Sequence, residues 1–202
     1  LLQPSEPQHA PTNQEVRFLR EARVTGQLEH PGIVPVYELG QRSDGTYYYT
    51  MKLVRGRTLD DAISACTNLS ERLRLLPHFI HVCQALGYAH SHDVIHRDIK
   101  PQNIMLGEFG ETVLLDWGLA KVRGRQDLGE SDLTRGIQQF SLDSQVTTYG
   151  QTVGTPSYMS PEQARGLVDE IDARSDTWSL GCVLYYLLAG HMPFEGQTVA
   201  ET

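Results

Sequence analysis

The segment 176–189 is the most apolar helical stretch of the chain, and it places the strongest limit on the fold. A helix this apolar is expected at the centre of a domain, where other elements cover its side chains. Its longest apolar run, about 180–189, is too short to span a bilayer. The remaining elements are therefore expected to pack around this helix, and Gly190 is expected to end it.

The composition is that of an ordinary globular domain and excludes some functions. The chain has 202 residues, enough for one large domain or two small lobes, and 40% of them are hydrophobic. A net charge of −8 without a basic tract predicts that no nucleic acid is bound. Residues 1–6 lack the regions of a signal peptide, and no membrane contact is expected within the chain. Three cysteines without a Cys-x-x-Cys motif fit a reducing compartment.

One helix and two strands are expected at the beginning of the chain. Thr12 begins a capping box, and the helical spacing of apolar residues continues to about Glu29. Residues 33–39 and 46–54 have the composition of strands, and Ser43-Asp44-Gly45 between them is a hairpin turn signal. These residues therefore predict a helix followed by a hairpin.

Helices dominate the prediction for the rest of the chain. Residues 59–65 form a short helix, and Ser70 can cap the next one. Pro77 is expected in the first turn of a long buried helix, because an interior proline would remove a hydrogen-bond donor. Residues 104–106 and 112–115 predict a second hairpin. The expected inner face of the long helix is Phe79, Ile80, Cys83, Leu86 and Gly87.

The stretch between this hairpin and the apolar helix has two different parts. Residues 121–153 are polar, rich in glycine and glutamine, and without clear periodicity, which is typical of a functional or disordered segment. Ser160-Pro161-Glu162-Gln163 is a helix start, with a cap, a proline in the first position and a reciprocal glutamine.

Four polar residues indicate phosphoryl transfer. Asp98, Lys100, Asn103 and Asp116 combine two carboxylates, an amide and an ammonium group within nineteen positions. Phosphoryl transfer requires positioning and charge neutralisation more than covalent help from the protein. A carboxylate can orient the acceptor hydroxyl, a lysine can reach the phosphate, and oxygen atoms of Asn and Asp suit Mg²⁺. The hairpin expected between them would bring Asp116 back beside Asn103.

These motifs resemble those of eukaryotic-type (Hanks-type) serine/threonine protein kinases, in the form found in bacteria. His96 to Asn103 is similar to the catalytic loop, and Asp116-Trp117-Gly118 is similar to the metal-binding segment. Glu21 resembles the ion-pairing glutamate of the first large helix, 154–162 the substrate-side loop, and 176–181 the signature of the central helix. The resemblance covers about residues 12–195, with the motifs in the family's order.

The resemblance implies a role for each of several residues. Asp98 would be the catalytic base, Lys100 would contact the γ-phosphate, and Thr155 would hydrogen-bond near Asp98. Asn103 and Asp116 would bind Mg²⁺. The residues implied in ATP binding are Glu21, Met51, Lys52, Val54, Lys100, Asn103 and Asp116. The residues implied in regulation are Arg97, which would bind a phosphorylated loop, and the candidate phosphorylation sites Thr147, Thr148 and Thr152.

The same resemblance implies an architecture and partners. The expected fold class is α+β, a truncated bilobal kinase fold with a partial N-lobe of one helix and about two strands and a mainly helical partial C-lobe. Residues 1–11 would be a lead-in, 12–54 the partial N-lobe and 55–202 the partial C-lobe, with the activation segment at about 116–162. ATP, Mg²⁺ and serine or threonine side chains of proteins would be the partners. The kinase portion would be cytoplasmic, and a kinase dimer could support trans-phosphorylation.

The chain also departs from the family pattern. Trp117 stands where phenylalanine is usual, and its indole N–H requires a partner when buried. No glycine-rich loop or preceding strand lysine occurs, and the helices that follow the central helix are absent, so a fragment is expected. Counting back from Glu21 places that lysine at or just before Leu1. The isolated 202 residues are therefore expected to be unstable and inactive.

Other functions remain open at this point. A pseudokinase that acts as an interaction module is the main alternative, and a small-molecule phosphotransferase of related fold is another. The histidine pairs 78/81 and 90/92 allow a zinc site, although no cysteine is suitably spaced. Tyr47-Tyr48-Tyr49 is interpreted as strand packing and not as a nucleic-acid platform, because no basic groove accompanies it.

Overall fold

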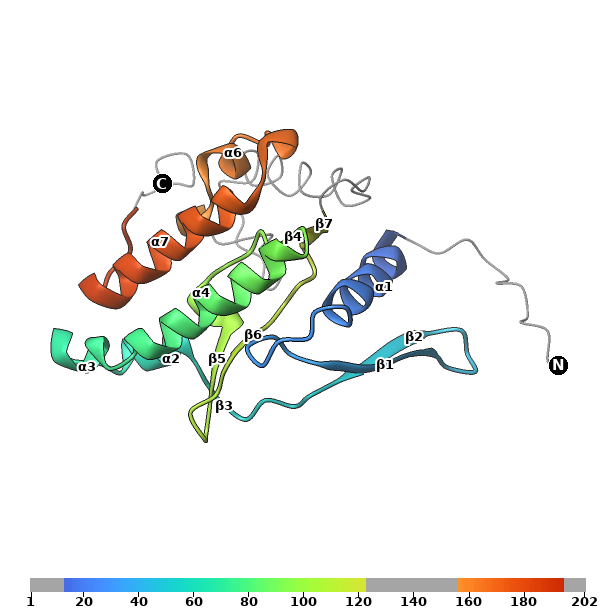
Figure 1. The fold of residues 1–202 in the computed structure, drawn as a ribbon, viewed down its shortest axis with the longest axis horizontal. Coiled ribbons are helices and arrows are strands. Elements are labelled where there is room, and N and C mark those ends of the chain that lie inside the picture. The colour runs from blue at the N-terminus through green and yellow to red at the C-terminus, as the bar shows by residue number, and fades with distance from the viewer. Residues whose placement is uncertain (1–12, 123–155, 195–202) are drawn as a thin grey trace, which may run out of the picture.

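The computed structural model describes residues 13–122 and 156–194. Figure 1 shows helix α1 beside a long hairpin on one side and the other helices gathered on the other. The sheets are small: β1 pairs with β2, β3 with β5 and β5 with β6, and β4 with β7. The elements before the second hairpin are α1 Asn13–Thr25, β1 Val36–Gln41, β2 Tyr47–Met51, β3 Gly56–Thr58, α2 Leu59–Ser64, α3 Leu69–Leu73, α4 Leu76–Ser91, β4 Val94–Ile95 and η1 Pro101–Asn103. The later ones are β5 Ile104–Gly107, β6 Thr112–Leu114, β7 Lys121–Val122, η2 Pro156–Tyr158, α6 Pro161–Ala164, η3 Val168–Glu170 and α7 Ala173–Ala189. This mixture of helices and small sheets confirms the expected α+β class.

Helix α1 is shorter than the sequence predicts. It ends at Thr25 and does not continue to about Glu29. Glycine is a poor helix former, and Gly26 stands at the point where the helix gives way to tighter turns. Gln27 N donates to Val24 O at 3.2 Å, and Leu28 N donates to Thr25 O at 3.1 Å. The predicted cap at Thr12 lies outside the described residues.

The first hairpin confirms the turn predicted at Ser43-Asp44-Gly45. Gly45 has a φ of 89°, and Gly45 N donates to Arg42 O at 3.0 Å. Asp44 Oδ1 accepts from Thr46 N at 2.9 Å, which closes the turn from its own side chain. Both strands are shorter than predicted: the first begins at Val36, after Pro35, which cannot donate to a ladder, and the second ends at Met51.

Helix α4 begins where the sequence predicts, but it buries a different face. Pro77 lies in its first turn, as expected. The preceding helix is capped by Asn68, and the predicted cap at Ser70 is wrong. Ile80 is 53% exposed, and of the predicted inner face only Leu86 is fully buried. The buried face of α4 follows the i, i+3, i+4, i+7 pattern of Val82, Ala85, Leu86 and Ala89. This face is rotated around the helix axis by about one residue position from the predicted face.

Helix α7 is central to the core, as its apolar sequence predicts. It begins at Ala173, three residues earlier than expected, because Asp172 accepts from Arg174 N and caps it. It ends at Gly190, whose φ of 79° is the left-handed cap conformation. Figure 1 shows α4 and α7 lying along each other, and their buried apolar residues belong to one cluster.

The buried thiols belong to this core. Cys182 is buried on α7, and burial raises the pKa of its thiol to about 11. Cys83 is half-buried on α4, and burial also raises the pKa of its thiol. Both groups are therefore protonated near neutral pH, as expected for structural cysteines. Within the described part of the chain, none of the helices has the length and apolarity needed to cross a bilayer.

Candidate active site

Asp98 is at the centre of a hydrogen-bonded polar cluster. Its Oδ2 atom accepts from Lys100 Nζ at 2.8 Å and from Asn103 Nδ2 at 3.1 Å. Asn103 Nδ2 also donates to the backbone oxygen of Asp98 at 2.9 Å. The side chain of Asp98 is only 10% exposed and that of Lys100 only 16%. The structure thus brings three of the four predicted phosphoryl-transfer residues into direct contact.

The loop that carries this cluster has an unusual backbone. Arg97 has a φ of 69°, in the left-handed region that residues other than glycine rarely adopt. Asp176 of α7 holds this conformation, because its Oδ1 accepts from Arg97 N at 2.8 Å and its Oδ2 from His96 N at 2.9 Å. Oδ2 also lies 2.7 Å from His90 Nε2. Asp176 is completely buried, so these bonds replace all its contacts with water.

Gln163 holds the same loop from the opposite side. Its Nε2 atom donates to Arg97 O at 2.7 Å, and its side chain is buried. Its Oε1 accepts from the backbone and hydroxyl of Ser160, which completes the predicted capping box of α6. The sequence signal identified Gln163 only as a capping residue. Its contact with Arg97 spans 66 positions, so no local pattern could reveal it.

Asp116 reaches the site through the second hairpin, whose prediction is confirmed. Leu115 N donates to Asn103 O at 2.8 Å, and this bond places Asp116 next to the end of the Asp98 cluster. Asp116 has a φ of 59°, and its Oδ1 accepts from Gly118 N at 3.3 Å. Its side chain is exposed, unlike that of Asn103. The exposed Asp116 carboxylate therefore has oxygen atoms at the surface of the site, whereas the Asn103 amide is buried.

Trp117 anchors residues 116–119, here called the Asp116 segment, to the loop that carries Asp98. Its ring lies 4.6 Å from the His96 ring, centroid to centroid, and both side chains are buried. His96 Nε2 lies 3.1 Å from Leu115 O, which adds a second link between the two segments. Trp117 Nε1 is the one fully buried side-chain polar atom of the described residues that has no hydrogen-bond partner. The Trp117 indole ring, which is larger than the usual phenylalanine ring, is therefore buried here with its N–H group unsatisfied.

Glu21 approaches the same segment from α1. A methyl group placed on Gly118 would lie 3.3 Å from Glu21 Oε2 and 3.2 Å from Asp116 Oδ1, so the two carboxylates converge there. Burial raises the pKa of Glu21 and the negative charge of Asp116 adds to this, while the Tyr49 hydroxyl opposes both. This hydroxyl donates to Glu21 Oε1 at 2.9 Å. Helix α1 thus brings Glu21, one of the predicted site residues, to the Asp116 segment.

The other predicted residues lie in three places: near the end of the first hairpin, at Arg97 in the loop that carries Asp98, and outside the described residues. Met51 ends β2 and is 49% exposed, and Lys52 and Val54 follow it in the linker to β3. Lys52 N donates to Pro35 O at 3.1 Å, so this amide is already bonded. Arg97 is buried, and its Nε donates to Leu119 O in the Asp116 segment. The four threonines 147, 148, 152 and 155 lie outside the described residues.

The donor set suits a hard cation that is shared with a phosphate ligand. No three His, Cys, Asp or Glu side chains gather as metal ligands in residues 13–122 and 156–194. His78 instead contacts Thr112 Oγ1 at 2.7 Å, and His90 contacts Asp176. Asn103 and Asp116 supply oxygen atoms, and Mg²⁺ is commonly held by one or two such side chains together with phosphate oxygens and water. These residues therefore fit Mg²⁺ bound with a nucleotide.

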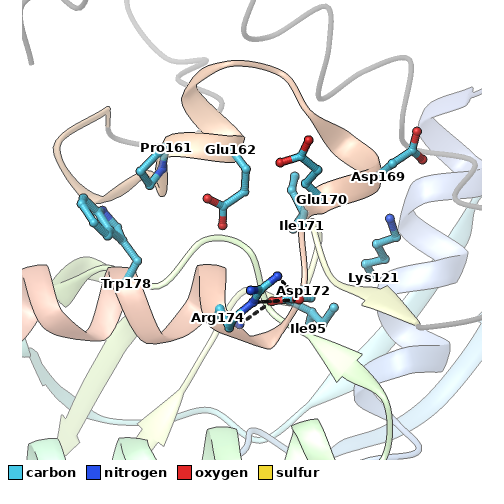
Figure 2. A pocket seen from close by; sticks show the side chains of 10 residues that line it. All are labelled: Ile95, Lys121, Pro161, Glu162, Asp169, Glu170, Ile171, Asp172, Arg174 and Trp178. Atoms are coloured by element: carbon cyan, nitrogen blue, oxygen red, sulfur yellow. Dashed lines mark hydrogen bonds and ion pairs between the residues drawn. The ribbon is translucent and has the colours of Figure 1, made fainter.

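A separate hollow of about 830 Å³ lies between α6, η3 and the start of α7. Figure 2 shows Glu162 and Glu170 at one side and the Asp172–Arg174 pair at the other. Burial is the largest single influence on Glu162 and would raise its pKa, but hydrogen bonds from the Ser175 hydroxyl, its own backbone and Ser160 together leave the pKa below its usual range. None of the residues that line this hollow belongs to the Asp98 cluster.

Comparisons with known proteins agree with this geometry. Residues 5–202 match the family model of the protein kinase domain. The chain is 42% identical to the serine/threonine-protein kinase PknD of Protochlamydia amoebophila over 197 residues, 92% of this chain and 20% of that relative. It is 40% identical to the serine/threonine-protein kinase PknB of Mycolicibacterium smegmatis over 186 residues, 91% of this chain and 27% of that relative. The chain belongs to the protein kinase family, in the Hanks-type serine/threonine group that these bacterial proteins represent. It spans about a fifth to a quarter of the length of these relatives.

Proposed function

We propose that the full-length protein transfers the γ-phosphate of ATP to serine and threonine hydroxyls of proteins. The observation that carries this proposal is the Asp98 cluster, in which Lys100 and Asn103 hold one carboxylate oxygen at 2.8 and 3.1 Å. The family and the names of its relatives support the same chemistry. In this proposal the kinase portion lies in the cytoplasm, where ATP and protein substrates are available. A kinase dimer would allow one subunit to phosphorylate the other.

Each residue of the cluster has a distinct role in this proposal. Asp98 orients the acceptor hydroxyl and takes its proton as the new P–O bond forms and the bond from the γ-phosphorus to the β-phosphate oxygen breaks, with ADP as the leaving group. Lys100, whose ammonium group lies beside Asp98, neutralises charge on the transferred phosphoryl group. Asn103 and Asp116 would hold Mg²⁺, which supplies charge neutralisation on the phosphates when bound. Thr155 would bond near Asp98.

ATP would extend from this cluster toward the linker after β2. Lys52 and Val54 would offer backbone groups to the adenine, with Met51 at the back of that pocket. Glu21 would act through a cationic partner of the phosphates. These roles follow the family resemblance, and the described geometry supports most directly the one of Glu21, whose carboxylate faces Gly118.

Regulation would come from the segment before the substrate-side loop. Phosphorylation of Thr147 or Thr148, or of Thr152, would add a dianion that can pair with a nearby arginine. Arg97 is suited to such a role because its backbone is fixed on both sides, by Asp176 and by Gln163. Phosphopeptide mapping of the active full-length protein should find at least one of these threonines modified.

The proposed activity is tested with the full-length protein. Incubation with radiolabelled ATP, Mg²⁺ and a generic protein substrate should give phosphoserine or phosphothreonine, and removal of Mg²⁺ with EDTA should abolish the transfer. Nucleotide binding without any transfer, also after addition of Mn²⁺, would contradict the proposal and favour a pseudokinase that acts as an interaction module.

Replacing Gln163 by glutamate should weaken catalysis without disturbing the cap of α6. The new carboxylate can still accept from Ser160, but it would place an oxygen against the Arg97 oxygen that now receives a hydrogen bond. We expect kcat to fall about ten-fold and the domain to lose about 1–3 kcal/mol of stability. Steady-state kinetics and thermal unfolding measure the two effects. Replacing the exposed Gln84 by glutamate should change neither kcat nor stability. Equal kcat and stability of the Gln84 and Gln163 variants would contradict the role of Gln163 in positioning the loop at Arg97.

A further inference from the structure

Tyr49 connects the first hairpin to the candidate active site through Glu21. It lies on β2, opposite Leu39 of β1, and its hydroxyl donates to Glu21 Oε1 at 2.9 Å. Its ring also packs against Phe18, with centroids 4.8 Å apart. Phe18 and Glu21 are three positions apart on α1, so they share a face of that helix. Figure 1 shows α1 lying along this hairpin.

The hydrogen bond determines how the Glu21 carboxylate is presented. Oε1 receives the Tyr49 hydroxyl, and Oε2 lies toward Gly118, where the Asp116 carboxylate also converges. Two carboxylates in a half-buried site repel each other, and burial disfavours their charged forms. Burial and the Asp116 charge raise the pKa of Glu21, while the Tyr49 hydroxyl lowers it. The hydroxyl therefore stabilises the anion that the other neighbours disfavour.

We propose that Tyr49 is a positioning residue that directs the Glu21 carboxylate at the Asp116 segment, and so prepares the site for magnesium-bound ATP. This proposal rests on the proposed kinase function. The ring contact with Phe18 fixes the distance between β2 and α1, and the hydroxyl fixes the orientation of the carboxylate. Nucleotide binding then requires less rearrangement of Glu21, which is the benefit of a preorganised site.

Replacing Tyr49 by phenylalanine isolates the hydroxyl, because the ring and its contact with Phe18 are retained. In the full-length protein, the dissociation constant of the magnesium complex of AMP-PNP should rise about three- to ten-fold, less than the full contribution of a hydrogen bond to a charged group, because Glu21 is partly exposed to water. The KM for ATP should rise by the same factor, with kcat changed less than about two-fold. A purely structural role would lower the active fraction, and hence kcat, with an unchanged dissociation constant.

The neighbouring residue provides a matched control. Tyr48 is on the same strand, and its hydroxyl donates to Glu38 Oε1 at 3.1 Å in an exposed position, whereas that of Tyr49 donates to Glu21. Replacing Tyr48 by phenylalanine should leave nucleotide affinity unchanged. A double-mutant cycle that adds Glu21→Gln should show that the Tyr49 effect largely disappears when Glu21 is neutral, because the hydroxyl acts through this carboxylate.

The outcomes separate this proposal from the proposed function. If the wild-type protein binds no magnesium–AMP-PNP, the kinase proposal itself fails. If the wild-type protein binds the nucleotide and the Tyr49 variant binds it equally well, only the positioning role is overturned. An equal loss in the Tyr48 and Tyr49 variants would also overturn it, because the effect would then belong to the hairpin and not to Glu21.

Discussion

Replacing Asp98 by asparagine should lower kcat for phosphate transfer by about a hundred- to ten-thousand-fold, the range expected when a general base is removed. An amide can still accept one hydrogen bond from Lys100 or Asn103, so the cluster keeps its shape. It cannot take a proton from the acceptor hydroxyl. The KM for ATP should therefore change little, since the loss belongs to the transition state and not to ground-state binding.

Asp93 gives a matched control for this substitution. It is exposed, five positions before Asp98, and its φ of 60° is in a region that asparagine also adopts. Replacing Asp93 by asparagine should leave kcat and stability unchanged. Steady-state kinetics of both variants of the full-length protein, with a thermal unfolding scan, measure the difference. A fully active Asp98 variant would show that another group serves as the base.

Replacing Asp176 by asparagine should loosen the loop that carries Asp98 and destabilise the domain by about 3 kcal/mol. The carboxylate accepts from the amides of His96 and Arg97 and contacts His90, in a position with no exposure to water. Asparagine keeps one acceptor oxygen and places an NH₂ group against a second donor. Buried hydrogen bonds to a charged group contribute about 1.5–3 kcal/mol each, and an unsatisfied donor adds its desolvation penalty.

Hydrogen exchange locates this effect in the full-length protein. The amides of His96 and Arg97 should exchange faster, while those in the middle of α4 should change only with the overall stability. The same substitution at exposed Asp169 should have no effect on either. Unchanged exchange at positions 96 and 97 would mean that Arg97 keeps its left-handed conformation without the carboxylate, which would contradict the role given to Asp176.

The local features of the fold could be predicted from the sequence because their causes are local. Pro77 must lie near a helix start, Gly190 can adopt the left-handed cap, and Ser43-Asp44-Gly45 closes a hairpin. The order of the motifs also indicated the family and the α+β class. The predictions at Pro77, Gly190 and the hairpin turn each depend on one residue and its immediate neighbours, whereas the family was indicated by several motifs in order along the chain.

The contacts that assemble the site could not be predicted in this way. The bonds from Gln163 to Arg97 and from Tyr49 to Glu21 join residues 66 and 28 positions apart. The buried face of α4 was predicted one register away because the packing partner, and not the helix, selects it. Gly26 ended α1 early, although the apolar spacing continued beyond it. For the long-range bonds and the buried face of α4, tertiary packing decided among patterns that the sequence permits, whereas the end of α1 has a local cause in Gly26.

The long separation between Asp176 and the loop it holds affects the order in which the protein matures during synthesis. The bonds to His96 and Arg97 span 80 and 79 positions. At a synthesis rate of about 5–20 residues per second, the loop leaves the ribosome roughly 4 to 16 seconds before Asp176 does. During this interval the carboxylate that accepts from the amides of His96 and Arg97 is absent. A nascent chain therefore carries all the residues of the Asp98 cluster before it can arrange them for catalysis.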